Sequence, residues 1–413
     1  MKYQFKADIN SKEYDEFVKK FPSTTFMQTS SWSLVKTAWE SSFVGMYDGK
    51  KLVCAAMILK RKLFLGKKLF YIPRGFVIDY SDKNLLNEFV SSLKDYAKKN
   101  KGIDIKIDPF ICFSEDNIQN IRKDKGIEIR KSFVNDTKEI VSNIEEVGFK
   151  HGGYKKEVNA YIQPRYTMAI SLKDKNGKLY EKEALRRTFP KNTRNYIGTY
   201  QEERGVEFSY SKNKDDVKYL ISVLKETEKR QHISLRSEDY FKKVMDAFSD
   251  NAVLFFAHVN IDKYIKFLKN DMLEHENKKE FCLNQIEEAK KVKEKYGNKP
   301  LAGATIVMMP TCDNGIKTAS FLYAGTNTEI LPSLKITNGL MFYRLCYCLD
   351  KGCDYCDLGG IDGSLEDHLS TFKSKFNPNV LELVGEYDLI INKFWYNLFN
   401  LAMKVRKFIM SKR

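Results

Sequence analysis

The sequence has no long apolar segment and none of the common nucleotide-binding signatures. No run of about 18 apolar residues occurs in its 413 residues, so we expect no transmembrane helix. The N-terminal segment MKYQFKADIN lacks the apolar core of a signal peptide, which favours a cytoplasmic protein. Neither G-x-x-x-x-G-K-[ST] nor G-x-G-x-x-G is present, so P-loop hydrolysis and dinucleotide-dependent redox chemistry have no support.

Residues that bind metals are few or poorly spaced. The five histidines are isolated and form no H-E-x-x-H pair. Four of the eight cysteines, Cys346, Cys348, Cys353 and Cys356, have a spacing that resembles a zinc site. The first two fall within a helical pattern, and the other two span a turn and a strand. We therefore expect no metal site and expect reduced thiols.

Acidic residues are outnumbered by basic ones. The chain has 70 Lys and Arg against 54 Asp and Glu, a net charge of +16. This excess indicates an anionic partner, such as nucleic acid, anionic lipid or a phosphorylated substrate. A lysine-rich composition without a specific partner is the alternative. The hydrophobic content of 43% and the 28 Phe are those of a folded protein, and the length allows two or three domains.

One pattern of strands and helix occurs twice, at an offset of about 250 residues. The matched segments are 51–58 with 300–307, 68–72 with 320–325, 85–102 with 339–352, and 103–108 with 353–358. The repeat predicts an α/β (α+β) fold of two duplicated domains, at residues 1–150 and 151–387, with a cleft between them.

Two further segments lie outside the repeated pattern. Residues 259–299 carry apolar side chains at steps of three and four in two runs, which predicts an antiparallel helical hairpin inserted in the second copy. A protruding basic arm favours partner binding, with a packed hairpin as the alternative. Residues 388–413 predict a basic amphipathic helix that packs on its own domain or, alternatively, lies on an anionic bilayer.

The segment from Asp354 to Pro378 is the most suggestive of chemistry. A predicted strand ends at Gly359-Gly360, where the absence of a Cβ lets another backbone or a ligand approach closely. Lys373 follows between aromatic residues and is placed to stabilise developing negative charge. A β-turn with solvated lysines is the alternative.

Five motifs together resemble the Fem family, whose members build the interpeptide bridge of bacterial peptidoglycan. In chain order they are F-M-Q-x3-W-x3-K (26–36), Y-I-P-R-G (71–75), K-I-D-P (106–109), R-x3-Y-F (236–241) and D-L-G-G-I…F-K-x2-F-x-P (357–378). The resemblance covers essentially the whole chain. It implies two GNAT-like domains, with an arm that meets tRNA.

The resemblance also implies the substrates and the site. The donor would be an aminoacyl-tRNA, and the acceptor an amine on the stem peptide of lipid II or UDP-MurNAc-pentapeptide, with no cofactor and a monomeric enzyme. The implied substrate-binding residues are Lys36, Arg74, Arg194 and Tyr240. The implied catalytic residues are Lys373, Phe372 and Asp108.

The residues themselves are compatible with this chemistry. Aminolysis of an activated ester needs two substrates held together and a cation for the oxyanion, without ATP or a metal. Lys373 supplies such a cation, whereas Asp108 either accepts a proton or caps the end of a strand.

Two other classes of function stay open. One is a CoA-dependent GNAT N-acyltransferase, although no [RQ]-x-x-G-x-[GA] loop is present. The other is a non-catalytic RNA- or membrane-binding protein that uses the arm and the tail. In each case we expect a cytoplasmic protein, with peripheral contact to the anionic inner membrane leaflet as a further expectation.

Overall fold

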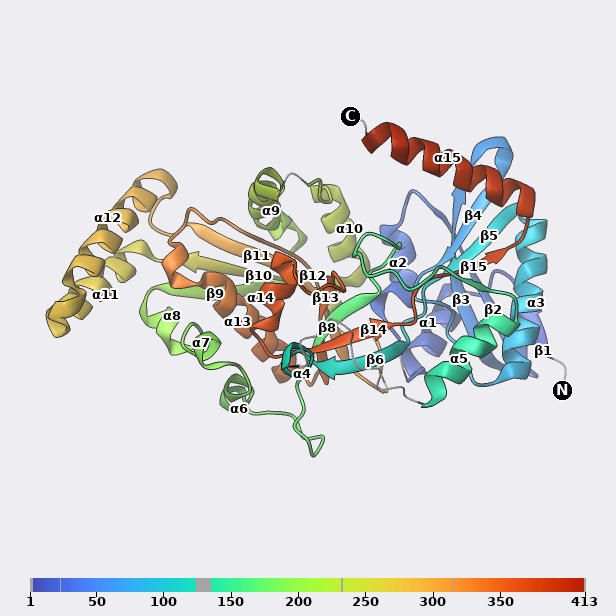
Figure 1. Cartoon of the computed structure of the whole chain (residues 1–413), viewed down its shortest axis with the longest axis horizontal. Coiled ribbons are helices and arrows are strands. Elements are labelled where there is room, and N and C mark those ends of the chain that lie inside the picture. The colour runs from blue at the N-terminus through green and yellow to red at the C-terminus, as the bar shows by residue number, and fades with distance from the viewer. Residues whose placement is uncertain (1–2, 23, 124–134, 232, 314, 412–413) are drawn as a thin grey trace.

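The chain forms two mixed sheets flanked by helices in a computed structural model that describes residues 3–22, 24–123, 135–231, 233–313 and 315–411 (Figure 1). The strands of the first sheet, in spatial order, are β1 (Tyr3–Lys6), β2 (Glu40–Asp48), β3 (Lys51–Lys62), β4 (Lys68–Ile72), β5 (Gly102–Ile107), β15 (Tyr387–Ile390) and β7 (Lys150–His151). Those of the second sheet are β6 (Cys112–Asn117), β14 (Asn379–Leu383), β8 (Tyr166–Ser171), β13 (Tyr355–Ile361), β12 (Thr318–Thr326), β11 (Leu301–Met308), β10 (Ala252–Val259) and β9 (Val206–Ser211).

The duplication predicted from the sequence is confirmed by the topology. Each sheet contains one parallel pair, β4–β5 in the first and β12–β13 in the second, among antiparallel neighbours. Helices α1 (Ser11–Lys20) and α2 (Ser30–Val35) follow β1, as α9 (Val217–Gln231) and α10 (Glu238–Phe248) follow β9. The parallel pairs are connected by α3 (Lys83–Lys99) and α13 (Ile336–Asp350), because parallel strands need a crossover.

The two sheets do not divide at residue 150. Strand β6 precedes that position but pairs with β14 in the second sheet, and β15 near the C-terminus pairs with β5 in the first. Each unit therefore completes its sheet with a strand from the other end of the chain. Periodicity marks a segment as a strand, but it does not say which sheet edge the segment will join.

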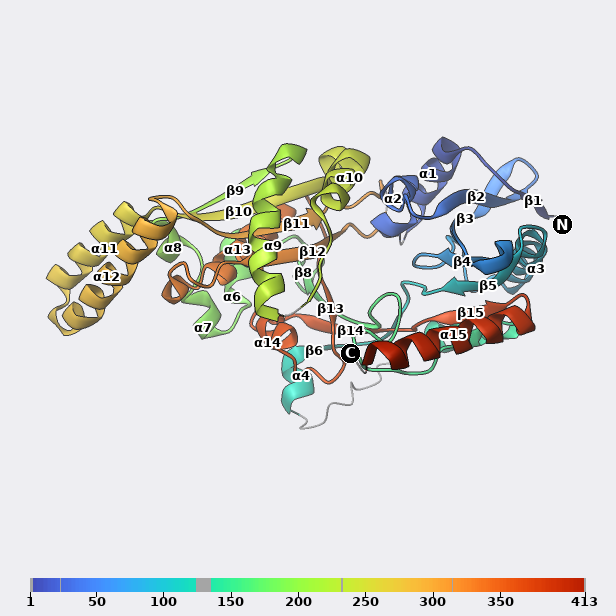
Figure 2. The same cartoon turned by 90° about the horizontal axis from the view of Figure 1, so that it is seen from above.

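The units also share apolar packing. In Figure 2, α2 lies beside α10, and the ring centroids of Phe26 and Phe248 are 5.9 Å apart. Trp32 of α2 and Phe241 of α10 are buried in the same cluster. Burial of this shared surface fixes the units against one another, so residues of both can build one site.

The inserted arm has the predicted form. Helices α11 (Ile261–Glu274) and α12 (Lys279–Tyr296) are joined by the 3-10 turn η5 (Glu276–Lys278) and extend from one end of the molecule (Figure 1). Buried side chains line their contact: Ile261, Tyr264, Leu268, Cys282, Ile286, Ala289 and Val292. The buried contact stops short of His275, which is exposed at the end of α11.

The C-terminal helix α15 (Lys393–Ser411) differs from the favoured expectation that it packs on its domain. Its first turn does so, because Trp395 lies 5.5 Å from Phe64 and Tyr396 donates a hydrogen bond to Asp388. Beyond that turn, Leu401 and Val405 are exposed. Among the described residues, no helix has both the length and the apolar character needed to cross a membrane.

The remaining elements connect these parts. The helices are α4 (Ile118–Lys123), α5 (Asn135–Glu146), α6 (Lys182–Arg187), α7 (Lys191–Arg194), α8 (Thr199–Glu203) and α14 (His368–Ser374). The other 3-10 turns are η1 (Phe26–Gln28), η2 (Phe64–Gly66), η3 (Lys214–Asp216), η4 (Ser249–Asn251) and η6 (Pro332–Leu334).

Candidate active site

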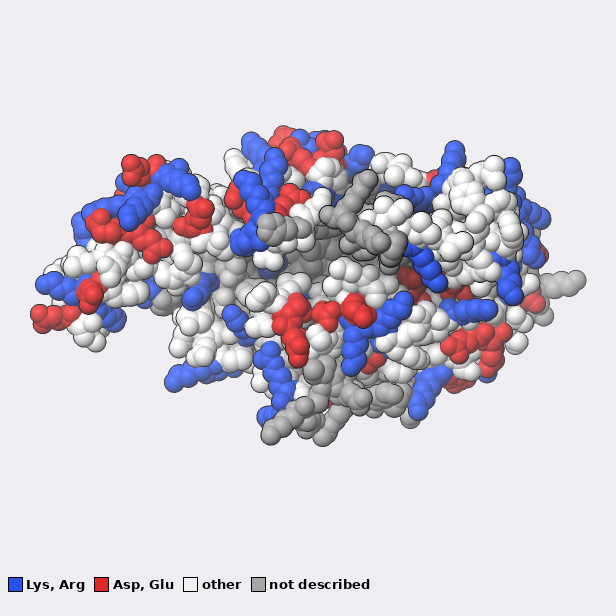
Figure 3. Space-filling model, turned by 45° about the horizontal axis from the view of Figure 1, so that its top comes forward, with Lys and Arg blue, Asp and Glu red and all other residues white. Residues whose placement is uncertain are grey.

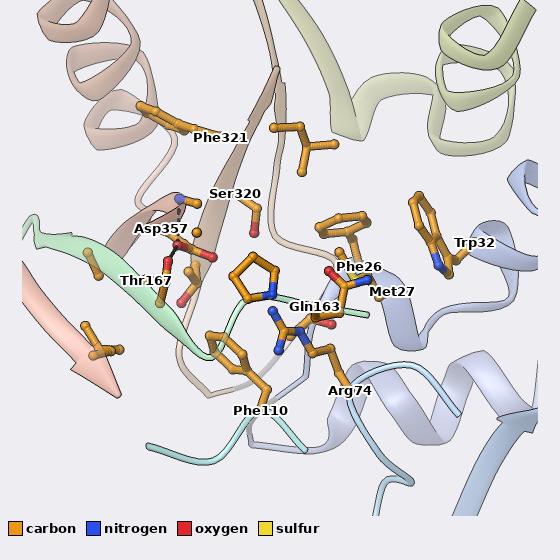
Figure 4. Close-up of a pocket in the computed structure, with 18 of the residues that line it drawn as sticks. Phe26, Met27, Trp32, Arg74, Phe110, Gln163, Thr167, Ser320, Phe321 and Asp357 are labelled. Atoms are coloured by element: carbon orange, nitrogen blue, oxygen red, sulfur yellow. Dashed lines mark hydrogen bonds between the residues drawn. The ribbon is translucent and has the colours of Figure 1, made fainter. Parts of the chain in front are cut away.

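A cavity of about 560 Å³ is lined by residues of both units (Figure 4). We call it the interlobe cavity. Its cationic and aromatic walls come from both units: Trp32, Lys36, Arg74 and Phe110 from the first, and Arg236, Tyr240 and Tyr323 from the second. A ligand in this cavity would therefore contact both copies of the duplicated fold.

Lys36 is presented to the interlobe cavity by the end of α2. Its Nζ lies 4.4 Å from the centre of the Trp32 ring, one turn earlier, and 5.8 Å from that of Tyr240. Burial, followed by the nearby Arg236 charge, lowers the pKa of Lys36 to about 8. A partly dehydrated ammonium beside a second cation favours an anionic ligand.

Arg236 is the second cation of this wall, and it is absent from the residues predicted from the sequence. Its guanidinium lies 5.4 Å from the ring of Tyr240, four residues later, at the start of α10. A hydrogen bond with Tyr323 raises the pKa of Arg236 further. The signal is present in the sequence, because Arg236 opens the R-x3-Y-F motif that also contains Tyr240, one of the predicted site residues.

Arg74 occupies a left-handed turn, with a φ of 58°, after β4. The buried carboxylate of Asp108 holds this turn, accepting hydrogen bonds from the Arg74 backbone N–H at 2.6 Å and the Tyr71 hydroxyl at 2.9 Å. Burial raises the pKa of Asp108 to about 6. Asp108 does not line the interlobe cavity, so its contacts favour the predicted cap over the predicted base.

A second cavity of about 250 Å³ lies beyond the end of the β12–β13 pairing. We call it the strand-gap cavity. It contains Phe372 and Lys373, and it shares residues 321–323, Gly359 and Gly360 with the interlobe cavity. The two cavities therefore meet at the Gly359-Gly360 backbone.

Lys373 reaches this junction from α14. Its Nζ donates hydrogen bonds to the carbonyls of Gly359 at 2.8 Å and Gly360 at 2.9 Å, and the residue is only 5% exposed. Burial lowers the pKa of Lys373 to about 8, against the opposing charges of Asp357 and Asp367. The sequence-based alternative of a solvated lysine is therefore wrong.

Both glycines at the junction are required by close contacts. Gly359 has a φ of 83°, and a Cβ there would lie 3.1 Å from the Phe321 carbonyl oxygen. A Cβ on Gly360 would lie 2.2 Å from Cγ of Pro164. Asp357 accepts hydrogen bonds from the Thr167 hydroxyl and from the Gly359 N–H, and so helps to hold this backbone (Figure 4).

Arg194 is not brought to either cavity. It lies on α7, where its Nη1 donates to the carbonyls of Arg187 at 3.2 Å and Phe189 at 3.0 Å. These backbone contacts hold the turn that follows α6. In place of Arg194, the fold puts Arg236 beside Lys36.

Solved structures with this fold include the crystal structure of FemX. It superposes with a TM-score of 0.74 at 23% identity, over 96% of this chain and 99% of that chain. A tandem GNAT protein from the clavulanic acid biosynthesis pathway superposes with a TM-score of 0.51 at 8% identity, over 95% and 99% of the two chains. The fold is therefore a duplicated GNAT-like fold, as the sequence predicted.

Curated relatives extend over nearly the full chain. The lipid II:glycine glycyltransferase of Staphylococcus haemolyticus is 26% identical over 95% of this chain and 94% of its own length. The enzyme of the same name from Staphylococcus saprophyticus is 26% identical over 97% of each chain. The FemAB family model matches residues 9–285 and 270–404, and this chain therefore belongs to the FemAB family.

Proposed function

We propose that this chain transfers an aminoacyl group from an aminoacyl-tRNA to an amine on the stem peptide of a peptidoglycan precursor. The relatives named lipid II:glycine glycyltransferase support an aminoacyltransferase that builds the peptidoglycan bridge and a lipid-linked acceptor. The observation that carries the proposal is the meeting of two cation-lined cavities at Gly359-Gly360.

The interlobe cavity is the proposed acceptor site. Lys36, Arg74 and Arg236 would bind the acceptor's pyrophosphate, because phosphate oxygens favour clustered cations. Trp32, Tyr240 and Phe110 supply apolar surface around these charges. The stem peptide would then extend toward the junction.

The strand-gap cavity is the proposed donor site. The acceptor nitrogen attacks the ester carbonyl carbon, the bond from that carbon to the ribose oxygen breaks, and the nitrogen's proton passes to the ribose oxygen. Lys373 would stabilise the negative charge that forms on the carbonyl oxygen and then on the leaving ribose oxygen. Phe372 would pack against the aminoacyl end.

The arm and the surface charge support an extended nucleic-acid contact. Lys and Arg are spread over both units and the arm on the face shown in Figure 3, interleaved with Asp and Glu. We assign the tRNA body to the arm formed by α11 and α12, reached from the strand-gap cavity across the second unit.

Helix α15 supports peripheral contact with an anionic membrane. Its exposed apolar residues follow helical spacing: Phe394, Leu398, Leu401, Val405 and Ile409. Exposed Phe64 and Leu65 lie on the loop that Trp395 contacts, beside Lys67. An apolar stripe with flanking lysines matches an anionic interface.

The test supplies a mixture of charged tRNAs and two acceptors, a UDP-linked pentapeptide in solution and lipid II in anionic vesicles. Mass spectrometry should detect the addition of an amino acid only when charged tRNA is present. Transfer from acetyl-CoA without tRNA would contradict the proposal.

The membrane contact is tested with the double variant Leu401→Glu, Val405→Glu. We expect it to lose vesicle binding and turnover on vesicle-borne lipid II, while Tyr219→Glu, an exposed aromatic on α9, retains both. Equal vesicle binding by the two variants would refute the role of α15.

A further inference from the structure

Arg344 of α13 is a buried guanidinium without a carboxylate partner. It is 5% exposed, and its Nε donates to the Leu340 carbonyl at 3.3 Å and its Nη1 to the Thr305 hydroxyl at 2.9 Å. The group lies 4.4 Å from the ring centre of Phe321. Within the described part of the chain, no carboxylate forms an ion pair with it.

A second buried arginine shows how this fold otherwise treats such a charge. Arg165 is 3% exposed, and its guanidinium forms an ion pair with Glu382. Removing an arginine from water costs several kcal/mol unless an anion compensates the charge. Arg344 bears this cost with neutral partners only.

The position of Arg344 suggests what compensates it. It lines the strand-gap cavity together with Lys373, so two buried cations border the same space. A guanidinium has five N–H donors, of which one is used by Leu340 and one by Thr305, while the sulfur of Met341 lies 3.2 Å from Nη2. Spare donors and uncompensated charge thus remain for a ligand.

A purely structural role does not require the charge. The Thr305 hydroxyl donates its own hydrogen bond to the Tyr323 carbonyl at 2.7 Å, so loss of Arg344 leaves that hydroxyl paired. Leu340 lies within α13, where its carbonyl faces the backbone N–H of the following turn. A methionine would therefore fill the site without leaving an unpaired polar group.

We propose that Arg344 binds an oxyanion of the donor's terminal nucleotide in the strand-gap cavity, as a second cation beside Lys373. This inference rests on the proposed function, which assigns the donor to that cavity. The oxyanion has two possible sources: the 5′-phosphate of the terminal adenosine, present in the ground state, or the tetrahedral oxygen formed on the ester during attack.

The first measurement is equilibrium binding of adenosine 5′-monophosphate and of adenosine to the wild type and to Arg344→Met. If the phosphate is the ligand, the monophosphate binds the wild type at least about tenfold more tightly than adenosine, and the variant loses this difference.

The second measurement is single-turnover transfer. If the tetrahedral oxygen is the ligand, the two probes bind alike, and Arg344→Met lowers the transfer rate by about 100- to 1,000-fold with donor affinity unchanged. Arg344→Lys should restore part of either loss. Arg186→Met, at a half-buried arginine that pairs with Glu183 and lines neither cavity, should change neither quantity.

Thermal unfolding separates this role from a structural one. Because Arg344→Met removes a buried, uncompensated charge, we expect its Tm to equal or exceed that of the wild type. A variant with unchanged binding and transfer, or one whose losses follow a lowered Tm, would overturn the proposal. Failure of the wild type to use any charged tRNA would instead refute the proposed function. The binding of adenosine 5′-monophosphate and of adenosine could still be compared in that case.

Discussion

The two copies of the duplicated fold treat their parallel strand pairs differently. In the first unit, β4 and β5 are paired over five positions, up to Ile72 and Ile107. In the second unit, β12 and β13 are paired at only three positions and separate after Ser320 and Asp357. The strand-gap cavity lies where the second pair separates. The same topology thus gives a closed sheet in one copy and a ligand-sized opening in the other.

The groups at the two strand ends explain this difference. Asp108, after β5, accepts hydrogen bonds from the Arg74 backbone N–H and the Tyr71 hydroxyl, and these contacts hold the ends of β4 and β5 together. At the corresponding end of β13, Gly359 and Gly360 present their carbonyls to Lys373. The first copy uses a carboxylate to hold a turn, while the second places a cation at an opening. One copy therefore supports a wall of the proposed acceptor site, and the other provides the proposed reaction centre.

Removal of the Lys373 charge should have the largest effect. We expect Lys373→Ala to lower single-turnover transfer by about 100- to 1,000-fold, because the oxyanion loses a preorganised cation in a buried site. Donor tRNA binding should be largely retained, since most phosphate contacts would lie elsewhere. Rapid-quench transfer and filter binding measure the two quantities.

Lys375→Ala provides the matched control for this prediction. Lys375 ends the same helix, but its side chain is exposed and it lines neither cavity. We expect this variant to transfer at close to the wild-type rate. An unchanged rate in Lys373→Ala would refute the catalytic role of that lysine.

Displacing β13 at the edge of the strand-gap cavity should have an intermediate effect on the transfer rate. In Gly360→Ala, the new Cβ would meet the Pro164 ring at 2.2 Å, so β13 must move. We expect a loss of about 1–3 kcal/mol in the free energy of unfolding and a transfer rate at least about tenfold lower. Denaturant titration and single-turnover assays test both.

Gly303→Ala on β11 is the control for this substitution, because the new Cβ would meet the side-chain ends of Leu340 and Thr326 at 3.3 Å and the Gly325 carbonyl oxygen at an ordinary contact distance of 3.5 Å. Its effect on both quantities should be small. If the two glycine variants have the same stability and transfer rate, the close contact between Gly360 and Pro164 does not determine either quantity.

Neutralising Asp108 should have the smallest effect on turnover. Asp108→Asn retains an acceptor for the Arg74 turn, so we expect kcat to change by less than about tenfold, the loss expected without a general base being larger. A fall of 100-fold or more, with native stability retained, would instead support the predicted base.

The same variant should alter the pH dependence of stability. Because the folded pKa of Asp108 is raised to about 6, the native state holds its proton more tightly than the unfolded state. Stability from this group is therefore present at low pH and is lost as pH rises from about 4 through 6, by on the order of 2 kcal/mol. Burial also raises the pKa of Asp104, to about 7, so that group contributes a loss of its own in the same pH range. Urea unfolding at pH 4 and 6.5 should therefore show a loss that is smaller in Asp108→Asn than in the wild type by on the order of 2 kcal/mol.

Local patterns were sufficient for the elements and their repetition. The apolar face of α3 and the buried contact of α11 with α12 follow the 3.6-residue period of the sequence, because one face of each helix must be buried. The Gly359-Gly360 pair at the end of a predicted strand indicates a close approach of backbone, because neither residue carries a Cβ. The expected burial of the tail failed, because its apolar stripe has no partner surface among the described residues beyond the first turn.

The sequence by itself determined the duplicated fold and the inserted arm. It also named Lys36, Arg74, Tyr240, Phe372 and Lys373, which line the two cavities. Only the tertiary structure decided that β6 and β15 complete the opposite sheets, that Arg236 rather than Arg194 lies beside Lys36, and that Arg344 borders the strand-gap cavity without a carboxylate partner among the described residues. The physical reason is that periodicity reports which side chains must leave water. Which distant side chains then meet depends on strand pairing and on packing between the two units.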